Sequence, residues 1–224
     1  MIRHLHATLA AAVSLLCGCT DFDLPSALTR EQIVAVRSTP SALVPGSRAE
    51  LEAVIAGPDG LVEDAALTWS IDPLMAGVSS DVSIEVDDDG RAWLAVDEGA
   101  TPGGVVVALE VAGEDGPITA RKTVEITDQP RENPGPMGLE AEGQPIGETV
   151  EVAAGASIEL AASAESVDQP RYSWYATVGE IERFRHNPTE LVAPAEPAEG
   201  WLIAVVRDDA GGVAWEVRPL VVTP

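Results

Sequence analysis

The stretch that decides the fold is VSIEVDDDGRAWLAV, residues 82–96. Its apolar residues alternate with polar ones on both sides of the dipeptide Asp89-Gly90. A period of two is typical of a β-strand with one buried face, and an Asp-Gly step between two such runs indicates a hairpin. The stretch therefore predicts two antiparallel strands joined by an acidic turn.

The same alternation continues on both sides of this hairpin. It covers residues 49–55 and 67–72 before it and residues 105–126 after it, whereas no segment after residue 30 sustains a helical apolar period. About seven short strands then lie between residues 33 and 127, which is the strand count of an immunoglobulin-like β-sandwich. Trp69, in the third long strand, is the expected core aromatic of this domain.

A second, similar unit follows a proline-rich linker. Residues 128–136 (DQPRENPGP) contain three prolines, which oppose regular ladder bonding and stiffen the connection. Beyond the linker, VVVALEVAGEDGPITARKTVEI (105–126) aligns without gaps over WLIAVVRDDAGGVAWEVRPLVV (201–222). We therefore expect an all-β chain of two tandem immunoglobulin-like β-sandwiches, residues 33–127 and 137–224.

The first eighteen residues have the features of an export signal. Residues 7–16 (ATLAAAVSLL) are apolar apart from Thr8 and Ser14. As a helix they reach about 15 Å, half of a bilayer core, so residues 1–18 are predicted to be a signal peptide and not a membrane span.

Leu16-Cys17-Gly18-Cys19 resembles the lipobox of bacterial lipoproteins. The resemblance implies that Cys19 receives a diacylglyceryl group and fatty acyl chains such as palmitate, and that the signal is cut before it. Cys17 is excluded because the bulky Leu16 would precede it. Residues 19–32 are then the lipidated cysteine with a flexible tether. Thr20, which is not an aspartate, suggests the outer membrane by analogy with Gram-negative lipoproteins, with a periplasmic or surface orientation left open.

The charge of the chain restricts its partners. The formal net charge is −24, and loss of Arg3 with the signal makes it −25. Such a chain is repelled by nucleic acid and by anionic head groups, which excludes both as electrostatically driven partners. The two cysteines are Cys17 and Cys19, so the mature chain is expected to hold no thiol and no disulfide.

The second half resembles the PKD/Ig-like modules of bacterial surface proteins. The resemblance rests on YSWYATVGEIERF (172–184) and on the hairpin VRDDAGG (206–212). The whole chain resembles the Ig-repeat lipoproteins of myxobacteria and their relatives. The first half departs from the pattern, because Gly113-Glu114-Asp115-Gly116 replaces the Asp-Asp-Ala-Gly-Gly turn. These motifs imply fold geometry and specify no ligand.

The acidic turns are weak candidates for calcium. The carboxylates in question are Asp87 and Asp89 in the first half and Asp208 and Asp209 in the second. An EF-hand needs a bidentate Glu six residues after its Gly, but Val96 occupies that position. We interpret both segments as hairpin turns whose carboxylates face water.

No residue set predicts a catalytic centre, and no cofactor or metal site is expected. His186 is the only histidine after residue 18, and neither a G-x-S-x-G elbow nor a phosphate-binding loop accompanies it. The pairs Glu180/Glu182 and Glu140/Glu142 sit at strand spacing on one face, which supplies no cleft for a glycosidase pair.

Trp93 and Tyr175 fall on the faces opposite the apolar sets of their strands. Exposed aromatics mark binding surfaces, but these two rings could also pack under a loop or stack on an arginine such as Arg91 or Arg121.

The leading functional hypothesis is a non-catalytic, membrane-tethered envelope protein that acts as a spacer, adhesin or interaction module with a protein or glycan partner. The alternatives are a carbohydrate-binding module, assisted or not by calcium, and an enzyme of unrecognised type.

Overall fold

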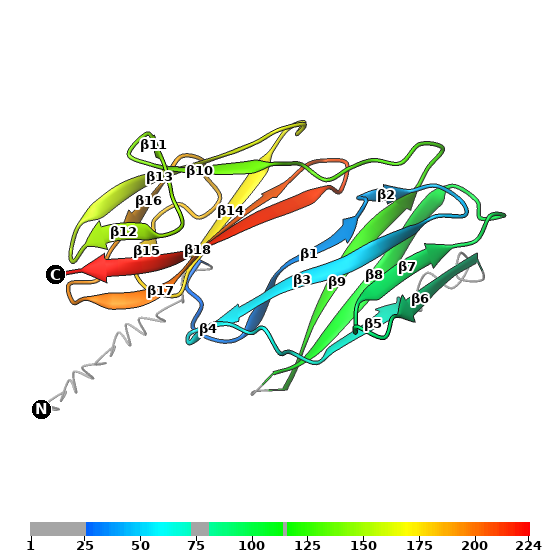
Figure 1. Cartoon of the computed structure of the whole chain (residues 1–224), viewed down its shortest axis with the longest axis horizontal. Coiled ribbons are helices and arrows are strands. Elements are labelled where there is room, and N and C mark those ends of the chain that lie inside the picture. Colours follow the sequence, from blue (N-terminus) through cyan, green and yellow to red (C-terminus); the bar gives the residue numbers. More distant parts are fainter. Residues whose placement is uncertain (1–25, 73–80, 114–115) are drawn as a thin grey trace, which may run out of the picture.

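The computed structural model describes residues 26–72, 81–113 and 116–224. Every named element in these ranges is a β-strand, and the strands form two sandwiches along the long axis of the molecule (Figure 1). Within the same ranges no helix has the length and apolar character needed to cross a bilayer. The expected signal peptide and Cys19 lie outside the described residues.

The first sandwich contains nine strands. They are β1 (Gln32–Thr39), β2 (Ala42–Leu43), β3 (Arg48–Gly57), β4 (Gly60–Leu61), β5 (Leu67–Ile71), β6 (Val82–Val86), β7 (Ala92–Val96), β8 (Gly103–Gly113) and β9 (Gly116–Ile126). One sheet has the order β1-β3-β7-β6, with β4 paired to β3, and the other has the order β2-β9-β8-β5. All pairs are antiparallel except β2 with β9.

The second sandwich repeats this plan. Its strands are β10 (Met137–Ala141), β11 (Gln144–Pro145), β12 (Val150–Ala153), β13 (Ser157–Ala164), β14 (Arg171–Ala176), β15 (Glu180–Ile181), β16 (Thr189–Val192), β17 (Ala198–Arg207) and β18 (Val213–Thr223). The sheets have the orders β11-β10-β13-β16-β15 and β12-β18-β17-β14, and β12 pairs with β18 in parallel.

The strand order identifies both units as immunoglobulin-like sandwiches. In each, the first, second, fifth and fourth main strands form one sheet and the third, sixth and seventh form the other, as in the ABED and CFG sheets of that fold. The first strand is also continued by a short segment, β2 or β12, that joins the opposite sheet beside the last strand. The prediction of two tandem immunoglobulin-like sandwiches is therefore confirmed.

Each sandwich has its own apolar core built from the inward faces of its strands. Leu51, Leu94 and Val107 are buried in the first core, as the alternation predicts. The second core surrounds Trp174, whose side chain is fully buried and donates a hydrogen bond from Nε1 to the carbonyl of His186 at 3.0 Å. Trp69, the aromatic expected in the first core, is only partly buried at its margin.

Two apolar residues of the expected inward sets are exposed. Val86 is 65% and Leu67 is 39% exposed. Both stand at an end of an outer strand, β6 or β5, where the opposite sheet no longer covers the side chain. The alternation therefore predicts the face that a side chain takes but not how completely the opposite sheet covers it.

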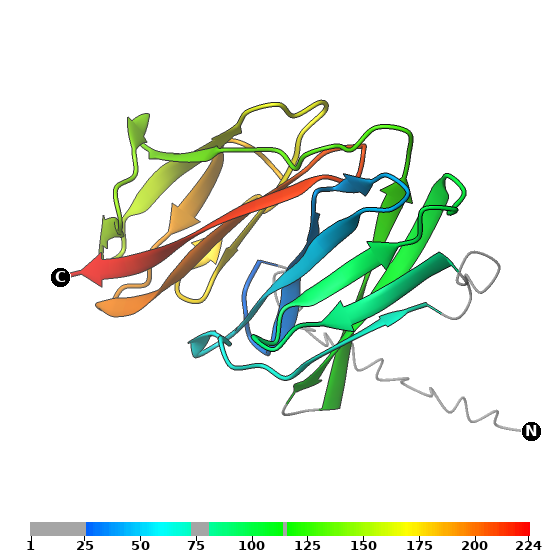
Figure 2. The ribbon, with the colours of Figure 1, turned by 45° about the vertical axis from the view of Figure 1, so that its right-hand side comes forward.

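The two sandwiches pack against each other through a third apolar cluster, which we call the seam cluster. Its buried members are Leu28, Val34, Ala35, Val54, Ala56, Ile203, Val205 and Val213, and Leu61, Tyr175, Trp215 and Val217 pack around them. Along β17, Leu202 and Ala204 face the core of the second sandwich, whereas Ile203 and Val205 face the first sandwich. In both views the turn end of the β17–β18 hairpin reaches the first sandwich (Figure 2).

The linker is held by hydrogen bonds and not by prolines alone. Asn133 donates from Nδ2 to the carbonyl of Ser38 in the first sandwich at 2.8 Å, and its Oδ1 accepts the N–H of Val213 in the second at 3.0 Å. Arg131 donates from Nη1 to the carbonyl of Ala210 at 3.1 Å. Residues 128–136 thus bond to both sandwiches and fix their relative position.

The expected flexible tether over residues 19–32 is wrong for its second half. Ser26 is buried, accepts the N–H of Ala176 at 3.2 Å and donates from Oγ to the carbonyl of Ile181 at 3.3 Å. Leu28 is buried in the seam cluster, and β1 begins at Gln32. Residues 26–32 dock because Leu28 gains apolar contacts and the backbone gains partners on the outer edge of β14.

We expect Trp174→Ala to lower the free energy of unfolding by about 3–5 kcal/mol, because it leaves a cavity in the second core and removes a buried hydrogen bond. Denaturant unfolding followed by circular dichroism measures this loss. The matched control is Trp93→Ala, whose ring is only half buried and whose loss should be clearly smaller. A loss below about 1 kcal/mol for Trp174→Ala would contradict its position in the core.

Candidate functional site

The carboxylate of Asp87 closes the β6–β7 hairpin. Its Oδ1 accepts the N–H of Asp89 at 3.0 Å and that of Arg91 at 2.9 Å, and its Oδ2 accepts Nε1–H of Trp93 at 3.2 Å. The hydrogen bond from the Arg91 backbone is the main cause that lowers the pKa of Asp87 below its usual value. The predicted hairpin is present, and the carboxylate of Asp87 stabilises the turn by hydrogen bonds.

The second acidic turn works in the same way. Asp208 is buried, and its Oδ1 accepts the N–H of Ala210 at 2.9 Å and that of Gly212 at 2.7 Å. Asp209 forms an exposed ion pair with Arg171 at 3.3 Å. Among the residues that the structure describes, no three His, Cys, Asp or Glu side chains are grouped to hold a metal ion. The four candidate calcium ligands thus belong to two separate turns.

Trp93 remains a partly exposed aromatic on the outer face of β7. The guanidinium of Arg48 lies over its ring, 4.3 Å from the centroid, and Asp87 accepts its ring N–H. The stacking partner is therefore Arg48 on the neighbouring strand β3, and neither Arg91 nor Arg121. An aromatic ring flanked by a cation and a carboxylate offers both stacking and polar contacts to a ligand.

Tyr175 is not part of an open surface. Its side chain is half buried and packs against the seam cluster between the two sandwiches. The sequence placed it correctly on the face of β14 opposite Trp174, but the first sandwich and residues 26–28 cover that face. Its interpretation as a binding residue is corrected to a packing residue of the seam.

The remaining carboxylates and the histidine are solvated. Glu140, Glu180, Glu182 and His186 have exposed side chains. The backbone of His186 supports the second core, because its carbonyl accepts the indole N–H of Trp174. None of these side chains has a geometry that points to proton transfer.

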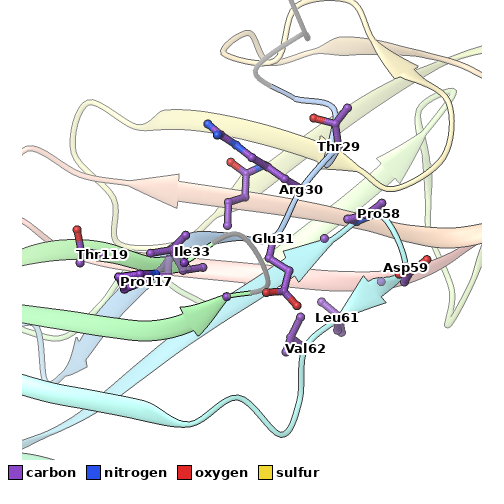
Figure 3. Close-up of a pocket in the computed structure, with 16 residues that line it drawn as sticks. Thr29, Arg30, Glu31, Ile33, Pro58, Asp59, Leu61, Val62, Pro117 and Thr119 are labelled. Atoms are coloured by element: carbon purple, nitrogen blue, oxygen red, sulfur yellow. The ribbon is translucent and has the colours of Figure 1, made fainter.

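A cavity of about 560 Å³ lies at the end of the first sandwich, where three segments meet (Figure 3). Residues 29–33, residues 57–62 of the β3–β4 hairpin, and Gly113 with residues 116–119 of the β8–β9 hairpin form its walls. Glu31 points toward Val62 in this view, whereas the guanidinium of Arg30 points the opposite way. The lining mixes apolar side chains such as Pro58 and Leu61 with carboxylate and hydroxyl groups.

Two glycines make room for Glu31 in this cavity. A Cβ at Gly57 would lie 3.1 Å from Cγ of Glu31, and one at Gly113 would lie 3.3 Å from its Oε2. The described lining residues include carboxylates and threonines but no histidine, cysteine or serine. The cavity can hold a partner's side chain or a small ligand by hydrogen bonds and apolar contact.

Sequence reasoning missed both this cavity and the seam. The signal for the seam is present in the chain: the buried runs 54–57 and 202–206 do not alternate, because both faces of these strand segments are covered. The cavity has no comparable signal, because Glu31 and Asp59 come from loops that only the fold brings together.

Comparisons with known proteins give no family. No protein-family model matches the chain, and no curated protein matches it. Among solved structures, a chimeric titin Z1Z2 functionalized with a peptide from decorin is 17% identical, with 88% of this chain and 99% of that chain covered and a TM-score of 0.30. The Ig1-2 module of the Drosophila receptor tyrosine phosphatase DLAR is 12% identical, with 87% and 100% covered and a TM-score of 0.33. Fibronectin(III)-like modules of Clostridium thermocellum CbhA are 14% identical, with 84% and 94% covered and a TM-score of 0.31.

We expect Asp87→Asn to destabilise the β6–β7 hairpin in a pH-dependent way. The pKa of Asp87 is lower in the folded chain than its usual 3.8, so its carboxylate stabilises the fold above the unfolded pKa. That contribution is lost as the pH falls through the folded pKa. The stability difference between wild type and Asp87→Asn, measured by urea unfolding, should be full at neutral pH and shrink below about pH 4. The control is Asp89→Asn, because the side chain of Asp89 does not accept these hydrogen bonds. An equal pH-dependent loss of stability in Asp89→Asn would contradict the role assigned to Asp87.

Proposed function

We propose that the chain is a non-catalytic lipoprotein of the bacterial envelope whose two immunoglobulin-like modules form one rigid interaction body. The observation that carries this proposal is the seam: a buried apolar cluster and a bonded linker hold the modules in one arrangement. A rigid pair presents its loops and end cavities to a partner at fixed spacing, which loosely linked modules do not.

The proposed anchor is a thioether-linked lipid on Cys19, at the start of the mature chain. Seven residue steps separate Cys19 from Ser26, where the chain docks on the second sandwich, so the anchor reaches at most about 25 Å. Two or three acyl chains hold such a body on a bilayer essentially permanently, since each buried methylene contributes about 0.8 kcal/mol. The proposal places the body close to the outer membrane, in an assembly of the PKD/Ig-like kind found in myxobacterial surface lipoproteins.

The anchor is tested by Cys19→Ala. Membrane fractionation of cells that make the wild-type protein should find it with the membranes, whereas Cys19→Ala should become soluble or remain unprocessed. Cys17→Ala is the matched control and should leave the protein in the membrane fraction. Mass spectrometry of the wild-type N-terminus should find acyl chains on Cys19. An unacylated N-terminus, or a Cys19→Ala protein that is processed and still membrane-bound, would contradict the anchor.

A second candidate function is carbohydrate binding at Trp93. The half-exposed ring beside Arg48 and Asp87 offers stacking and hydrogen-bonding groups of the kind that sugars use. Retention on a panel of immobilised envelope glycans, lost in Trp93→Ala but kept in a variant of an aromatic residue elsewhere, would favour this function. Retention that Trp93→Ala leaves unchanged would exclude this ring as the glycan site.

The rigidity of the pair is tested by weakening the seam cluster. We expect Ile203→Ser, at a fully buried seam position, to loosen the two sandwiches while each keeps its core. Small-angle X-ray scattering should then report a larger and broader distribution of dimensions, with strand content by circular dichroism retained.

Ile84→Ser, at a half-buried position of β6, is the control and should keep the wild-type scattering. Scattering of Ile203→Ser that equals that of the wild type would mean that the cluster does not hold the pair together.

A further inference from the structure

Positive charge gathers in a groove of about 310 Å³ at the seam. Its lining includes Arg121 and Lys122 of β9 in the first sandwich and Arg171 and Arg207 of β14 and β17 in the second, together with Asp208. The chain carries 13 basic residues against 37 acidic ones, so four cations in one groove run against its overall charge.

Two of the four cations are paired with carboxylates. Arg121 donates from Nε to Oδ2 of Asp72 at 2.6 Å. Arg171 forms its ion pair with Asp209 at 3.3 Å. The side chains of these two arginines are mostly exposed.

Lys122 and Arg207 form no ion pair within the described ranges. The ammonium group of Lys122 is buried and donates to the carbonyl of Gly211. Arg207 is half buried and donates from Nη2 to the carbonyl of Val34 at 3.0 Å. Both cations thus donate to neutral oxygens, since Nη1 of Arg207 also donates to Oγ of Ser173 at 3.4 Å.

One carboxylate lies beside these cations. Asp208 lines the groove and attracts Lys122, and its Oδ1 accepts two backbone N–H groups of its own turn. Burial is the main cause that lowers the pKa of Lys122, and repulsion from Arg207 adds to it. Two cations therefore lie near one another in a partly desolvated groove, where an anion would be favoured more strongly than in water.

The wall beside Lys122 is open at one glycine. Gly211 has a φ of +87° and lacks a side chain; a Cβ there would lie 3.8 Å from Nζ of Lys122. Gly211 and Gly212 of the β17–β18 hairpin both line the groove. The conformation of Gly211 favours glycine for its backbone as well.

We infer that this groove is a binding site for a compact tetrahedral oxyanion, phosphate or sulfate, held between Lys122 of the first sandwich and Arg207 of the second. The guanidinium group of Arg207 and the ammonium group of Lys122 supply directional donors from the two sides. A bound oxyanion bridges the sandwiches, so it stabilises the joint as well as the fold. This inference does not depend on the lipid anchor.

The test uses the full chain in detergent with inorganic phosphate as the probe, at constant ionic strength set by sodium chloride. Binding is followed by the 31P line width and by backbone amide shifts in the wild-type protein. We expect shifts at Gly211 and Gly212 and saturable binding. Loss of one charge-assisted hydrogen bond weakens binding about tenfold or more, so Lys122→Gln and Arg207→Gln should each do so.

Arg218→Gln is the matched control, because Arg218 lies on β18 outside the groove and pairs with Glu216. Its phosphate affinity should equal that of the wild type. If a groove variant fails to fold, the amide shifts of the wild-type protein still show where phosphate binds. No saturable binding by wild type, shifts confined to other surfaces, equal weakening by Arg218→Gln, or tighter binding of acetate than of phosphate and sulfate would each overturn the inference.

Discussion

The arrangement of the whole molecule depends on the burial of both faces of one strand. Leu202 and Ala204 of β17 lie in the core of the second sandwich, and Ile203 and Val205 lie against the first. Each large apolar side chain removed from water contributes about 1.5–3 kcal/mol, so a strand with two apolar faces must be covered on both. The second sandwich covers only the face of β17 that carries Leu202 and Ala204. The first sandwich and Leu28 cover the other, and this requirement fixes the joint.

Burial at the seam also explains the distribution of charge. An acidic surface keeps the chain soluble, and its carboxylates need no partner where water solvates them. The joint, by contrast, presents backbone carbonyls such as those of Val34, Ala210 and Gly211, which require donors once water is excluded. Arginine and lysine supply those donors over long reach. Lys122, Arg131 and Arg207 are the donors to these carbonyls where the two sandwiches meet.

The two conspicuous acidic turns have a local role. Asp87 and Asp208 each accept two backbone N–H groups of their own turn. In each turn a Gly in the left-handed region, Gly90 or Gly211, follows three residues later and suits that bonding. Their carboxylates order the hairpins that form the edge of the first sandwich and the seam of the second. The acidic clusters in the sequence thus reflect hydrogen bonds within the turns, and the two turns do not come together at one site.

The sequence by itself determined the fold class, the number of sandwiches and the hairpins at 82–96 and 198–223, because strand alternation and turn residues act between near neighbours. Its net charge of −24 is likewise a property of the sequence alone. The tertiary structure alone decided that Tyr175 is covered, that residues 26–32 dock, and that Lys122 meets Arg207 in a groove. These contacts join residues that are far apart in the chain. The alternation of apolar and polar residues indicates which face of the strand a side chain takes, but it does not indicate what packs against that face.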